Sequence, residues 1–312
     1  GATIGKVGFS DRDICTNQQI NSINPNSGID TKFLYYYMST EDFKKRVITS
    51  SGQATMPIIN KTKWSNLEVT YPPLPVQKKI VEKLDAAFAD IDKAISVTEK
   101  NIENDESLYQ SILIETFESL NKPSIKYLGE LCEVIAGQSP NGKFYNEKQE
   151  GFPFYQGKKL FGKKFLREPN VWTSKVSKIA KKNDLLISVR APVGEINFTK
   201  EEICIGRGLA AIRVNSIINR DYLYFYLKRI KNEITGTKGA VFNSINKSQI
   251  QSLDIPLVEL NEQLNIVLKL NNIHDQIDKI RNIYSRKLNE YNSLKSSILI
   301  QAFSGELTKD AA

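Results

Sequence analysis

The sequence is poor in the residues from which metal sites and acid–base catalysts are usually built. His274 is the only histidine, and the three cysteines, Cys15, Cys132 and Cys204, form no closely spaced pair. Zinc sites need clustered ligands, so none is expected, and unpaired cysteines fit a reducing, cytoplasmic environment. Cys15 and Cys204 both have apolar neighbours, and we expect each to be a small buried core residue.

Motifs for nucleotide or methyl-donor chemistry are also missing. Residues 137–144 fall one residue short of a phosphate-binding loop, because Phe144 stands where a Ser or Thr would hold magnesium and Pro140 removes a backbone N–H. The only consecutive prolines lack the preceding Asn or Asp of a methyltransferase motif. His274 lies inside an expected helix, a poor setting for general acid–base catalysis. We therefore expect a non-enzyme with no catalytic residue, no cofactor and no metal.

Long apolar runs are absent, and charge is unevenly distributed. No stretch approaches the roughly 18 apolar residues of a membrane span, so no membrane partner is expected. Of the net charge of +8, residues 121–256 carry 23 Lys and Arg against 12 Asp and Glu, whereas residues 76–120 carry 5 against 10. The basic segment indicates a polyanion ligand, although a generally basic proteome would give a similar balance. Charge alone leaves both explanations open.

The two ends of the chain follow the same pattern. An offset of 189 relates Gly5 to Gly194, Cys15 to Cys204, Leu34 to Leu223, Tyr35 to Tyr224 and Tyr37 to Tyr226; an offset of 186 relates Gln77 to Gln263, Leu84 to Leu270 and Ile91 to Ile277. A repeat of this length is too long for a solenoid unit and predicts two similar domains. Residues 121–189 have no counterpart in the first copy.

Each copy ends in a long expected helix. Residues 76–119 contain neither Gly nor Pro, and apolar residues recur there at seven-residue steps, as they do again after residue 257. Each helix would be roughly 60 Å long at 1.5 Å per residue. An apolar stripe of that length needs a partner, and the helix of the other copy is the natural one. The residues expected in the helix–helix seam are Leu84, Ile91, Leu108, Ile112, Ile277, Tyr284, Tyr291 and Ile298.

The remaining segments alternate short β-rich runs with Gly and Pro. Residues 185–189, 195–198 and 209–214 are expected strands, and residues 222–231 a short helix that residues 33–47 repeat. The expected fold class is α/β (α+β), with irregular mixed sheets joined by the two long helices. The expected divisions are 1–75 (a partial first domain), 76–120 (the first long helix), 121–256 (a complete second domain) and 257–312 (the second long helix and a tail).

Basic and aromatic residues interleave over residues 138–167, as they do in nucleic-acid interfaces. Lysines can hold phosphates, while Arg, Gln, Asn and Ser can read base edges. For any one of these residues a solvated surface role is the more common alternative. The candidate DNA-binding residues are Gln138, Ser139, Lys143, Tyr155, Gln156, Lys158, Lys159, Lys163, Lys164, Arg190, Arg207, Asn243, Ser244, Asn246 and Lys247.

Several of these segments together resemble the specificity subunit of type I restriction–modification systems. The resemblance covers the whole chain, and the junction between residues 72–77 and the first long helix is its most specific part. The matching segments are residues 72–85 (PPLPVQKKIVEKLD), 137–140 (GQSP), 189–194 (VRAPVG), 255–257 (IPL) followed by Glu262-Gln263, and 300–307 (IQAFSGEL).

The resemblance implies two target-recognition domains, each reading one half of a split double-stranded DNA site, separated by two antiparallel helices. It also implies that the helices fix the spacing and dock methyltransferase subunits, which restriction and translocase subunits join. A full member should have a complete first recognition domain, and this chain lacks the counterpart of residues 121–189. It is either a fragment or a truncation, and a second specificity chain is then a further candidate partner. The alternative function is a coiled-coil scaffold that binds methyltransferase without full two-part DNA recognition.

Overall fold

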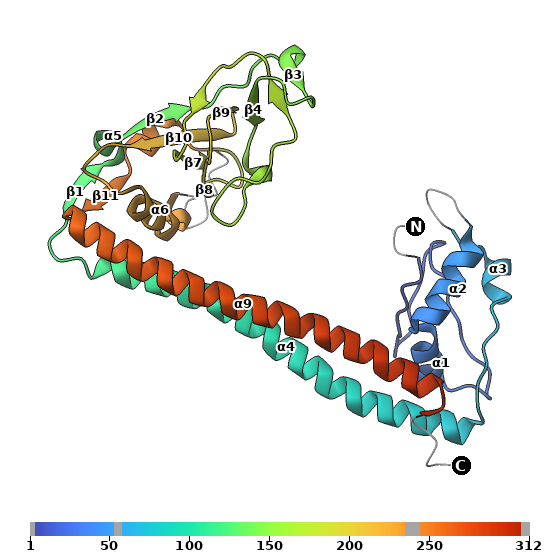
Figure 1. The fold of residues 1–312 in the computed structure, drawn as a ribbon. Helices are drawn as coiled ribbons and strands as arrows, with labels where there is room; N and C mark the ends of the chain where they lie inside the picture. The colour runs from blue at the N-terminus through green and yellow to red at the C-terminus, as the bar shows by residue number, and fades with distance from the viewer. Residues whose placement is uncertain (1–3, 53–57, 235–243, 307–312) are drawn as a thin grey trace. The chain divides into compact units, whose positions relative to one another are not determined.

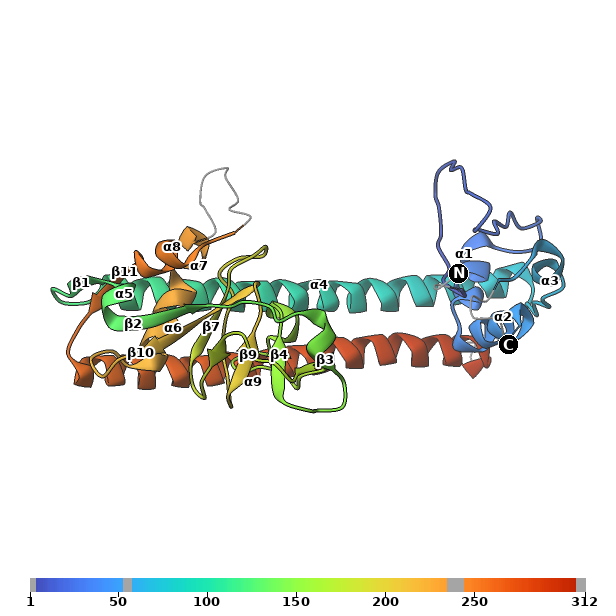
Figure 2. The ribbon, with the colours of Figure 1, turned by 90° about the horizontal axis from the view of Figure 1, so that it is seen from above.

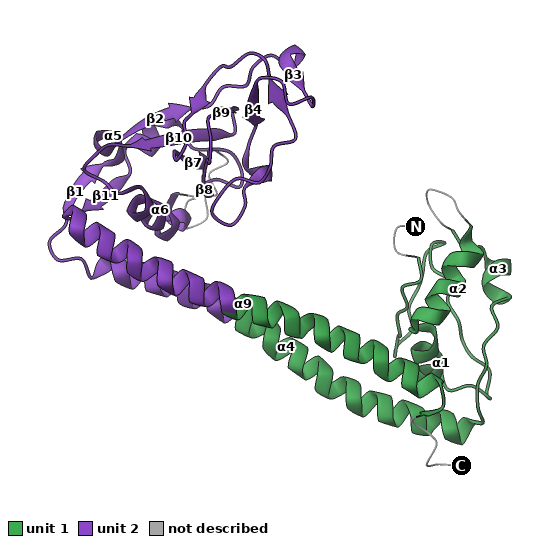
Figure 3. Ribbon diagram, in the orientation of Figure 1, with its two compact units in different colours: residues 1–103, 280–312 green, residues 104–279 purple. Residues whose placement is uncertain are grey.

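A computed structural model describes residues 4–52, 58–234 and 244–306. It divides into two compact units (Figure 3): unit 1 consists of residues 1–103 and 280–312, and unit 2 of residues 104–279. Two long helices, α4 (Leu74–Glu118) and α9 (Leu260–Phe303), contribute to both units, so the helices do not form a body of their own. Among the described residues, no helix is long and apolar enough to span a membrane.

The two long helices pair antiparallel in each unit. In unit 1, the Lys295 ammonium binds Asp92 and lies 5.1 Å from the centre of the Phe88 ring. In unit 2, the ring centres of Tyr109 and His274 are 5.4 Å apart. Contacts that advance along α4 thus move backwards along α9, and Figure 1 shows the two helices side by side. The expected helix pair is present.

The prediction that Leu108 lies in the helix–helix seam is wrong. Gln77, Leu84, Ile91 and Thr98 are buried at seven-residue steps, but the next buried residue is Tyr109, eleven positions further on. Such an 11-residue step turns the buried stripe around the helix relative to a strict heptad. Leu108 is therefore 54% exposed, while Tyr109 is 2% exposed. Of the other predicted seam residues, Leu84, Ile91 and Ile277 are buried and Ile112, Tyr284, Tyr291 and Ile298 are half-buried.

Unit 2 is built on two small sheets and a two-stranded ribbon (Figures 1 and 2). The first sheet has the order β2-β10-β7-β8 and is antiparallel throughout. The second has the order β3-β5-β4-β9-β6, with β4 and β9 parallel, so this sheet is mixed, as expected. The strands are β1 (Ser124–Tyr127), β2 (Cys132–Ala136), β3 (Tyr145–Asn146), β4 (Phe152–Tyr155), β5 (Trp172–Thr173), β6 (Ile179–Ala180), β7 (Leu185–Ser188), β8 (Ile196–Phe198), β9 (Ile203–Ile205), β10 (Leu209–Val214) and β11 (Asp254–Leu257), which pairs with β1.

The main core of unit 2 lies between the first sheet, helix α6 (Arg220–Arg229) and the two long helices. Tyr109, Leu113 and Phe117 of α4 and Leu270 of α9 belong to this core. A smaller core joins strands of the two sheets through β4, β7, β9 and β10. The described part of the unit also contains the short α-helices α5 (Leu128–Leu131), α7 (Lys231–Ile234) and α8 (Lys247–Gln251) and two single-turn 3-10 helices, Gly142–Phe144 and Lys158–Leu160.

Among its described residues, unit 1 has three short helices before α4 in the chain: α1 (Thr31–Met38), α2 (Glu41–Ser51) and α3 (Lys61–Ser65). The single helix expected at residues 33–47 is therefore two. Thr40 is the N-cap of α2, because its hydroxyl oxygen accepts a hydrogen bond from the Phe43 amide. Its backbone is extended, so α1 and α2 are separate helices. The core of unit 1 brings Phe33 and Tyr36 together with Leu84 of α4 and Leu299 of α9.

The repeat is visible in matching hydrogen bonds at two fully buried glutamines. The Gln77 Oε1 accepts from the backbone N–H of Asp30 at 2.8 Å, and the Gln263 Oε1 accepts from that of Asn219 at 2.7 Å. Each glutamine also donates to two backbone carbonyl oxygens, one in the loop before the domain helix and one just before its long helix. These are Gly28 and Pro72 for Gln77, and Ile217 and Val258 for Gln263. Asp30 and Asn219 are the N-caps of α1 and α6, so each glutamine ties a domain helix to a long helix.

The equivalent cysteines do not share an environment. Cys204 is fully buried, as expected, but Cys15 is exposed, so that prediction is wrong. Cys204 lies in β9 and is covered by β4 and β6, and both of these strands belong to residues 121–189, which have no counterpart in unit 1.

Candidate nucleic-acid interface

Three loops of unit 2 meet where strands end: residues 137–139 after β2, residues 156–157 after β4, and residues 206–208 between β9 and β10. Backbone hydrogen bonds join them, from Gln138 to Ile205 at 3.0 Å, from Gly206 to Tyr155 at 2.9 Å and from Gly208 to Gln156 at 3.0 Å. We call this group the loop cluster. Its members come from segments up to about 70 residues apart, so only the folded sheets bring them together.

Glycine permits the close approach of these backbones. A Cβ on Gly137 would lie 2.2 Å from the Gly206 carbonyl oxygen, and one on Gly208 would lie 2.6 Å from the Gln156 carbonyl oxygen. Both distances are far inside contact, and the obstructing atoms are backbone, which cannot move aside as a side chain could. A side chain at either position would therefore force these loops apart.

Four of the predicted DNA-binding residues converge on the loop cluster. The Ser139 hydroxyl donates to Gln156 Oε1 at 2.9 Å and accepts from the backbone N–H of Arg207 at 3.2 Å. Gln138, Gln156 and Arg207 are exposed, and Ser139 is half-buried. Ser177, which the sequence analysis missed, donates from its hydroxyl to the Gln138 carbonyl oxygen. No local sequence signal marked Ser177, because it lies 39 positions from its partner.

A second pair of loops lies beside the loop cluster. Val189 donates to the Gly208 carbonyl oxygen at 2.9 Å and accepts from the Ile245 amide at 3.0 Å. This pairing places Arg190 opposite Ser244 in a single antiparallel bridge, and both residues are exposed. Two further candidates, Asn246 and Lys247, sit at the start of α8; Lys247 is exposed, while the Asn246 side chain caps the helix. Asn243 lies outside the described residues.

Two lysines flank an aromatic ring next to the loop cluster. The ammonium of Lys143 is 5.1 Å, and that of Lys175 5.4 Å, from the centre of the Phe144 ring. The neighbouring Tyr145 hydroxyl donates to the Pro140 carbonyl oxygen at 2.9 Å, which ties this segment to the first loop. Both lysines are exposed. Lys175 was not among the predicted residues.

The lysines of residues 158–164 have mainly internal partners. The Lys163 ammonium lies 3.1 Å from the Asp278 carboxylate on α9. The Lys164 ammonium lies 3.0 Å from Asp221 and 5.6 Å from the centre of the Tyr224 ring. These two lysines thus join the segment of residues 158–164 to α6 and α9 within unit 2. Lys159 remains exposed.

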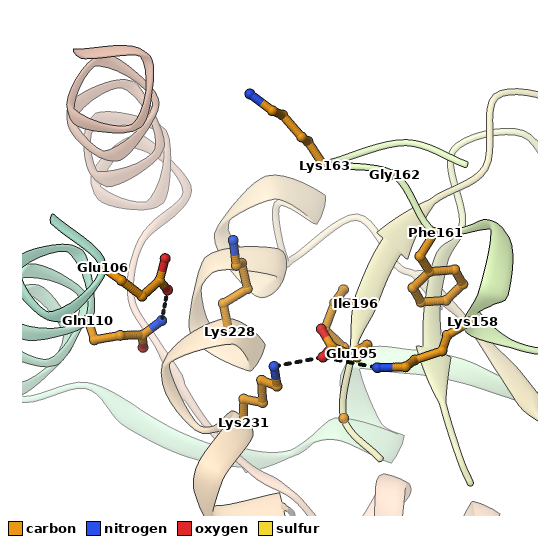
Figure 4. A pocket seen from close by; sticks show the side chains of 11 residues that line it. Glu106, Gln110, Lys158, Phe161, Gly162, Lys163, Glu195, Ile196, Lys228 and Lys231 are labelled. Carbon is orange, nitrogen blue, oxygen red and sulfur yellow. Dashed lines mark hydrogen bonds and ion pairs between the residues drawn. The ribbon is translucent and has the colours of Figure 1, made fainter. Parts of the chain in front are cut away.

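Lys158 lines a charged cavity of about 360 Å³ (Figure 4). The Glu195 carboxylate binds Lys231 at 2.8 Å and Lys158 at 3.4 Å there. Burial raises the pKa of Glu195, but the two lysines outweigh it and hold the pKa below its ordinary value. Glu195 is therefore an ionised partner for the lysines and not a proton donor at neutral pH.

Tyr155 and His274 could take part in proton transfer by residue type, but both have structural roles in unit 2. Tyr155 is buried, its hydroxyl donates to the Arg167 carbonyl oxygen at 3.0 Å, and burial raises its pKa to about 12. Tyr155 therefore supports the core and is not an exposed DNA contact. His274 is half-buried against Tyr109, and burial together with the charge of Lys228 lowers its pKa. In the described part of the chain, no three His, Cys, Asp or Glu side chains are grouped so as to hold a metal ion.

The chain matches a family model over most of its length. The model describes the type I restriction modification DNA specificity domain and covers residues 1–104 and 124–288. The chain belongs to this family. Its two matched segments each contain most of one copy of the repeat.

Known members show similarity across the chain. A Methanocaldococcus jannaschii protein named as the MjaX type I restriction enzyme specificity subunit is 35% identical over 254 residues, which are 75% of this chain and 57% of that protein. The EcoBI specificity subunit of Escherichia coli is 22% identical over 312 residues, which are 88% of this chain and 65% of that subunit. The chain thus spans less than two thirds of the length of either specificity subunit.

Solved structures of the type I systems share the fold. One, from work on complex assembly and conformational transition of the type I restriction–modification system, is 32% identical with a TM-score of 0.80, covering 88% of this chain and 71% of that one. The HsdS subunit of Thermoanaerobacter tengcongensis is also 32% identical, with a TM-score of 0.56, covering 89% of this chain and 71% of that subunit. The fold of the specificity family is therefore the fold of this chain.

Proposed function

We propose that this chain is a non-catalytic DNA-specificity subunit in which residues 121–256 read one half of a split DNA site. The observation that supports this most is the loop cluster, where Gln138, Gln156 and Arg207 are exposed on loops held tightly together. A rigid group of polar side chains can recognise a base sequence because its donors and acceptors keep fixed positions.

The chemistry of the loop cluster suits base edges. The Ser139 hydroxyl donates to Gln156 Oε1, which orients the amide and leaves its nitrogen, and the second lone pair of its oxygen, to meet a base. Arg207 carries a forked guanidinium, whose geometry matches the two acceptors of guanine in the major groove. Lys143 and Lys175, flanking the Phe144 ring, would hold phosphates and position the domain without reading sequence.

The long helices and the partners belong to the same proposal. Residues 76–120 carry 10 acidic against 5 basic residues, which disfavours contact with DNA and suits a protein surface. We assign these helices to spacing the recognition domains and docking methyltransferase subunits, which restriction and translocase subunits join. The proposed division remains 1–75, 76–120, 121–256 and 257–312, with a second specificity chain as a further partner.

The DNA-reading role is tested by the sequence that becomes methylated. The chain would be co-expressed with its methyltransferase subunit, and the methylated motif read by sequencing. Arg207→Ala should lose the preference at one position of one half-site, a cost of about 1–3 kcal/mol for a bidentate contact. Arg286→Ala, on an exposed stretch of α9, serves as the matched control and should leave the motif unchanged. An unchanged motif in Arg207→Ala would remove Arg207 from the reading set.

The phosphate contacts are tested by salt. Lys143→Ala combined with Lys175→Ala should weaken DNA binding on every sequence and reduce the salt slope of the affinity by roughly one per lysine. Lys163→Ala is the comparison, because its ammonium already binds Asp278 and should change the slope less. If the chain retains methyltransferase but the complex methylates without sequence preference, the scaffold function would replace the proposed one.

A further inference from the structure

Just after the Gln156 loop of the loop cluster, the chain doubles back over residues 160–167. Phe161 and Leu166 form an antiparallel bridge in this segment. Lys163 and Lys164 lie between the bridged residues and form its tip. We call residues 160–167 the lysine turn. Its base lies next to the loop cluster in the chain, and its tip reaches two helices.

The base of the lysine turn is fixed to the residues around Gln156. Only the 3-10 helix Lys158–Leu160 leads from residue 157 into the turn. The Arg167 guanidinium donates from Nη2 to the Lys159 carbonyl oxygen at 2.6 Å, and the Tyr155 hydroxyl donates to the Arg167 carbonyl oxygen at 3.0 Å. Because these bonds and the chain itself connect the two segments, a displacement of the turn also displaces the loop that carries Gln156.

The tip of the lysine turn is fixed to α6 and α9. The Lys164 ammonium lies 3.0 Å from the Asp221 carboxylate of α6 and 3.4 Å from the Asn271 Oδ1 of α9. It also lies 5.7, 5.6 and 5.9 Å from the ring centres of Phe198, Tyr224 and Phe225. The Lys163 ammonium lies 3.1 Å from the Asp278 carboxylate, one position further along α9. Both lysines of the tip thus bind the same long helix.

These contacts distinguish Lys164 from a lysine that holds phosphate. Its side chain is 26% exposed and that of Asp221 is 19% exposed, so solvent screens this pair less than a pair on the surface. Asp221 binds two cations in the described part of the chain, Lys164 and Arg220. Drawing the Lys164 ammonium out to DNA would remove one of them from a largely buried carboxylate, which is costly.

We propose that Lys163 and Lys164 are positioning residues for base recognition. By binding α6 and α9 they hold the lysine turn, and with it Gln156, in a fixed place relative to the long helix. The two lysines act on the base through Gln156 and do not contact DNA. Recognition groups must be held to within about 0.5 Å to keep their hydrogen-bond geometry, so a released tip loosens the selection of the base. This role rests on the proposed function, in which Gln156 reads a base.

The experiment separates selectivity from affinity. The chain, in complex with its methyltransferase subunit, is titrated with DNA duplexes that carry the methylated motif or one changed base pair. Gln156→Ala first identifies the base pair whose selection depends on Gln156, and one base pair ordinarily changes affinity by about 5- to 150-fold. Lys164→Met should reduce this ratio several-fold and leave the salt slope of the affinity unchanged. Because the ratio compares two duplexes with one preparation, a loss of folded protein does not change it.

Exchanging the charges of an exposed pair provides the rescue. Lys163→Glu and Asp278→Lys each bring like charges together at the tip, and each should reduce the ratio. The combined variant restores an ion pair with its ends exchanged and should recover most of the ratio, which it could not do if Lys163 bound phosphate. Lys182→Met, which removes an exposed lysine outside the loop cluster and the lysine turn, is the matched control and should leave the ratio unchanged.

The positioning role is overturned if Lys164→Met keeps the full ratio, or if the combined variant is as impaired as Lys163→Glu alone. A salt slope that falls by about one in Lys164→Met would make this lysine a phosphate contact and would also overturn it. If Gln156→Ala changes no ratio, the loop reads no base, and the proposed function fails at this loop together with the positioning role.

Discussion

Replacing Gln263 by alanine should destabilise unit 2 much more than unit 1. The Gln263 side chain is fully buried and makes three hydrogen bonds, accepting from Asn219 at 2.7 Å and donating to the carbonyl oxygens of Val258 at 2.8 Å and Ile217 at 3.1 Å. It joins the N-cap of α6 to the loop before α9. Alanine removes all three bonds and leaves three backbone groups without their partner.

The expected cost follows from these bonds. A neutral hydrogen bond contributes about 1 kcal/mol net, and a buried group left unsatisfied costs about 1–3 kcal/mol. Water can reach part of the space that the side chain vacates, so we expect a loss of about 2–4 kcal/mol in the free energy of unfolding of unit 2. Gln263→Glu should be no better than alanine, because a carboxylate cannot donate to the two carbonyl oxygens and adds a buried charge.

The two tryptophans allow each unit to be followed separately. Trp64 lies in unit 1 and Trp172 in unit 2. In a Trp64→Phe background, urea unfolding monitored by fluorescence reports on unit 2. With a slope of about 2 kcal/mol per molar urea, Gln263→Ala should lower the midpoint by about 1–2 M. In a Trp172→Phe background, the midpoint reported by Trp64 should move much less.

Gln77→Ala is the matched control, because Gln77 makes the equivalent bonds in unit 1 and should reverse the pattern. A shift below about 0.3 M in the Trp172 signal of Gln263→Ala would refute the reasoning. So would equal shifts from both tryptophans, since the shared helices would then make the chain unfold as one body.

Two further predictions concern unit 2. Tyr109→Ala should cost about 3–5 kcal/mol in unfolding free energy, as for a large buried aromatic residue, whereas exposed Leu108→Ala should cost little; equal costs by urea unfolding would contradict the 11-residue step in the seam. Burial raises the pKa of Asp221, but the hydrogen bonds and charges of Lys164 and Arg220 outweigh it and lower the pKa. The stability from this group is therefore present above the unfolded pKa of about 3.9 and is lost as the pH falls through the lower folded pKa. Lys164→Met should raise the Asp221 pKa and destabilise unit 2 at pH 7, with the difference from the unchanged protein shrinking below about pH 4 in pH-dependent melts; a pH-independent difference would rule out the ion pair as its source.

Much of the fold was predictable because its signals are local or periodic. The seven-residue stripe and the lack of Gly and Pro predicted both long helices, and the repeat predicted two related domains. Residues 185–189 and 209–214 were recognisable as strands from their β-branched and small apolar side chains. The errors arose where a residue depends on distant neighbours. At the 11-residue step that exposes Leu108, Tyr109 contacts His274 of α9 and Lys228 of α6, partners that the α4 sequence alone does not record.

The candidate site was predictable in its residue types but not in its assembly. Sequence reasoning grouped Gln138, Gln156 and Arg207 with the lysines of residues 158–164 because all are polar or basic. Only folding separated them: strand pairing brings the first three to one exposed edge, while Lys163 and Lys164 are held by carboxylates more than 50 residues further along the chain.

The sequence by itself determined that the chain contains two copies of one pattern, each ending in a long helix, with residues 121–189 present in one copy only. These properties reside in residue order and periodicity, so no coordinates are needed to find them. Tertiary structure alone decided which copies of the same strand sequence are strands. Residues 196–214 form β8–β10, whereas residues 7–25 do not, because a strand exists only where another backbone is present to accept its hydrogen bonds and cover its apolar face.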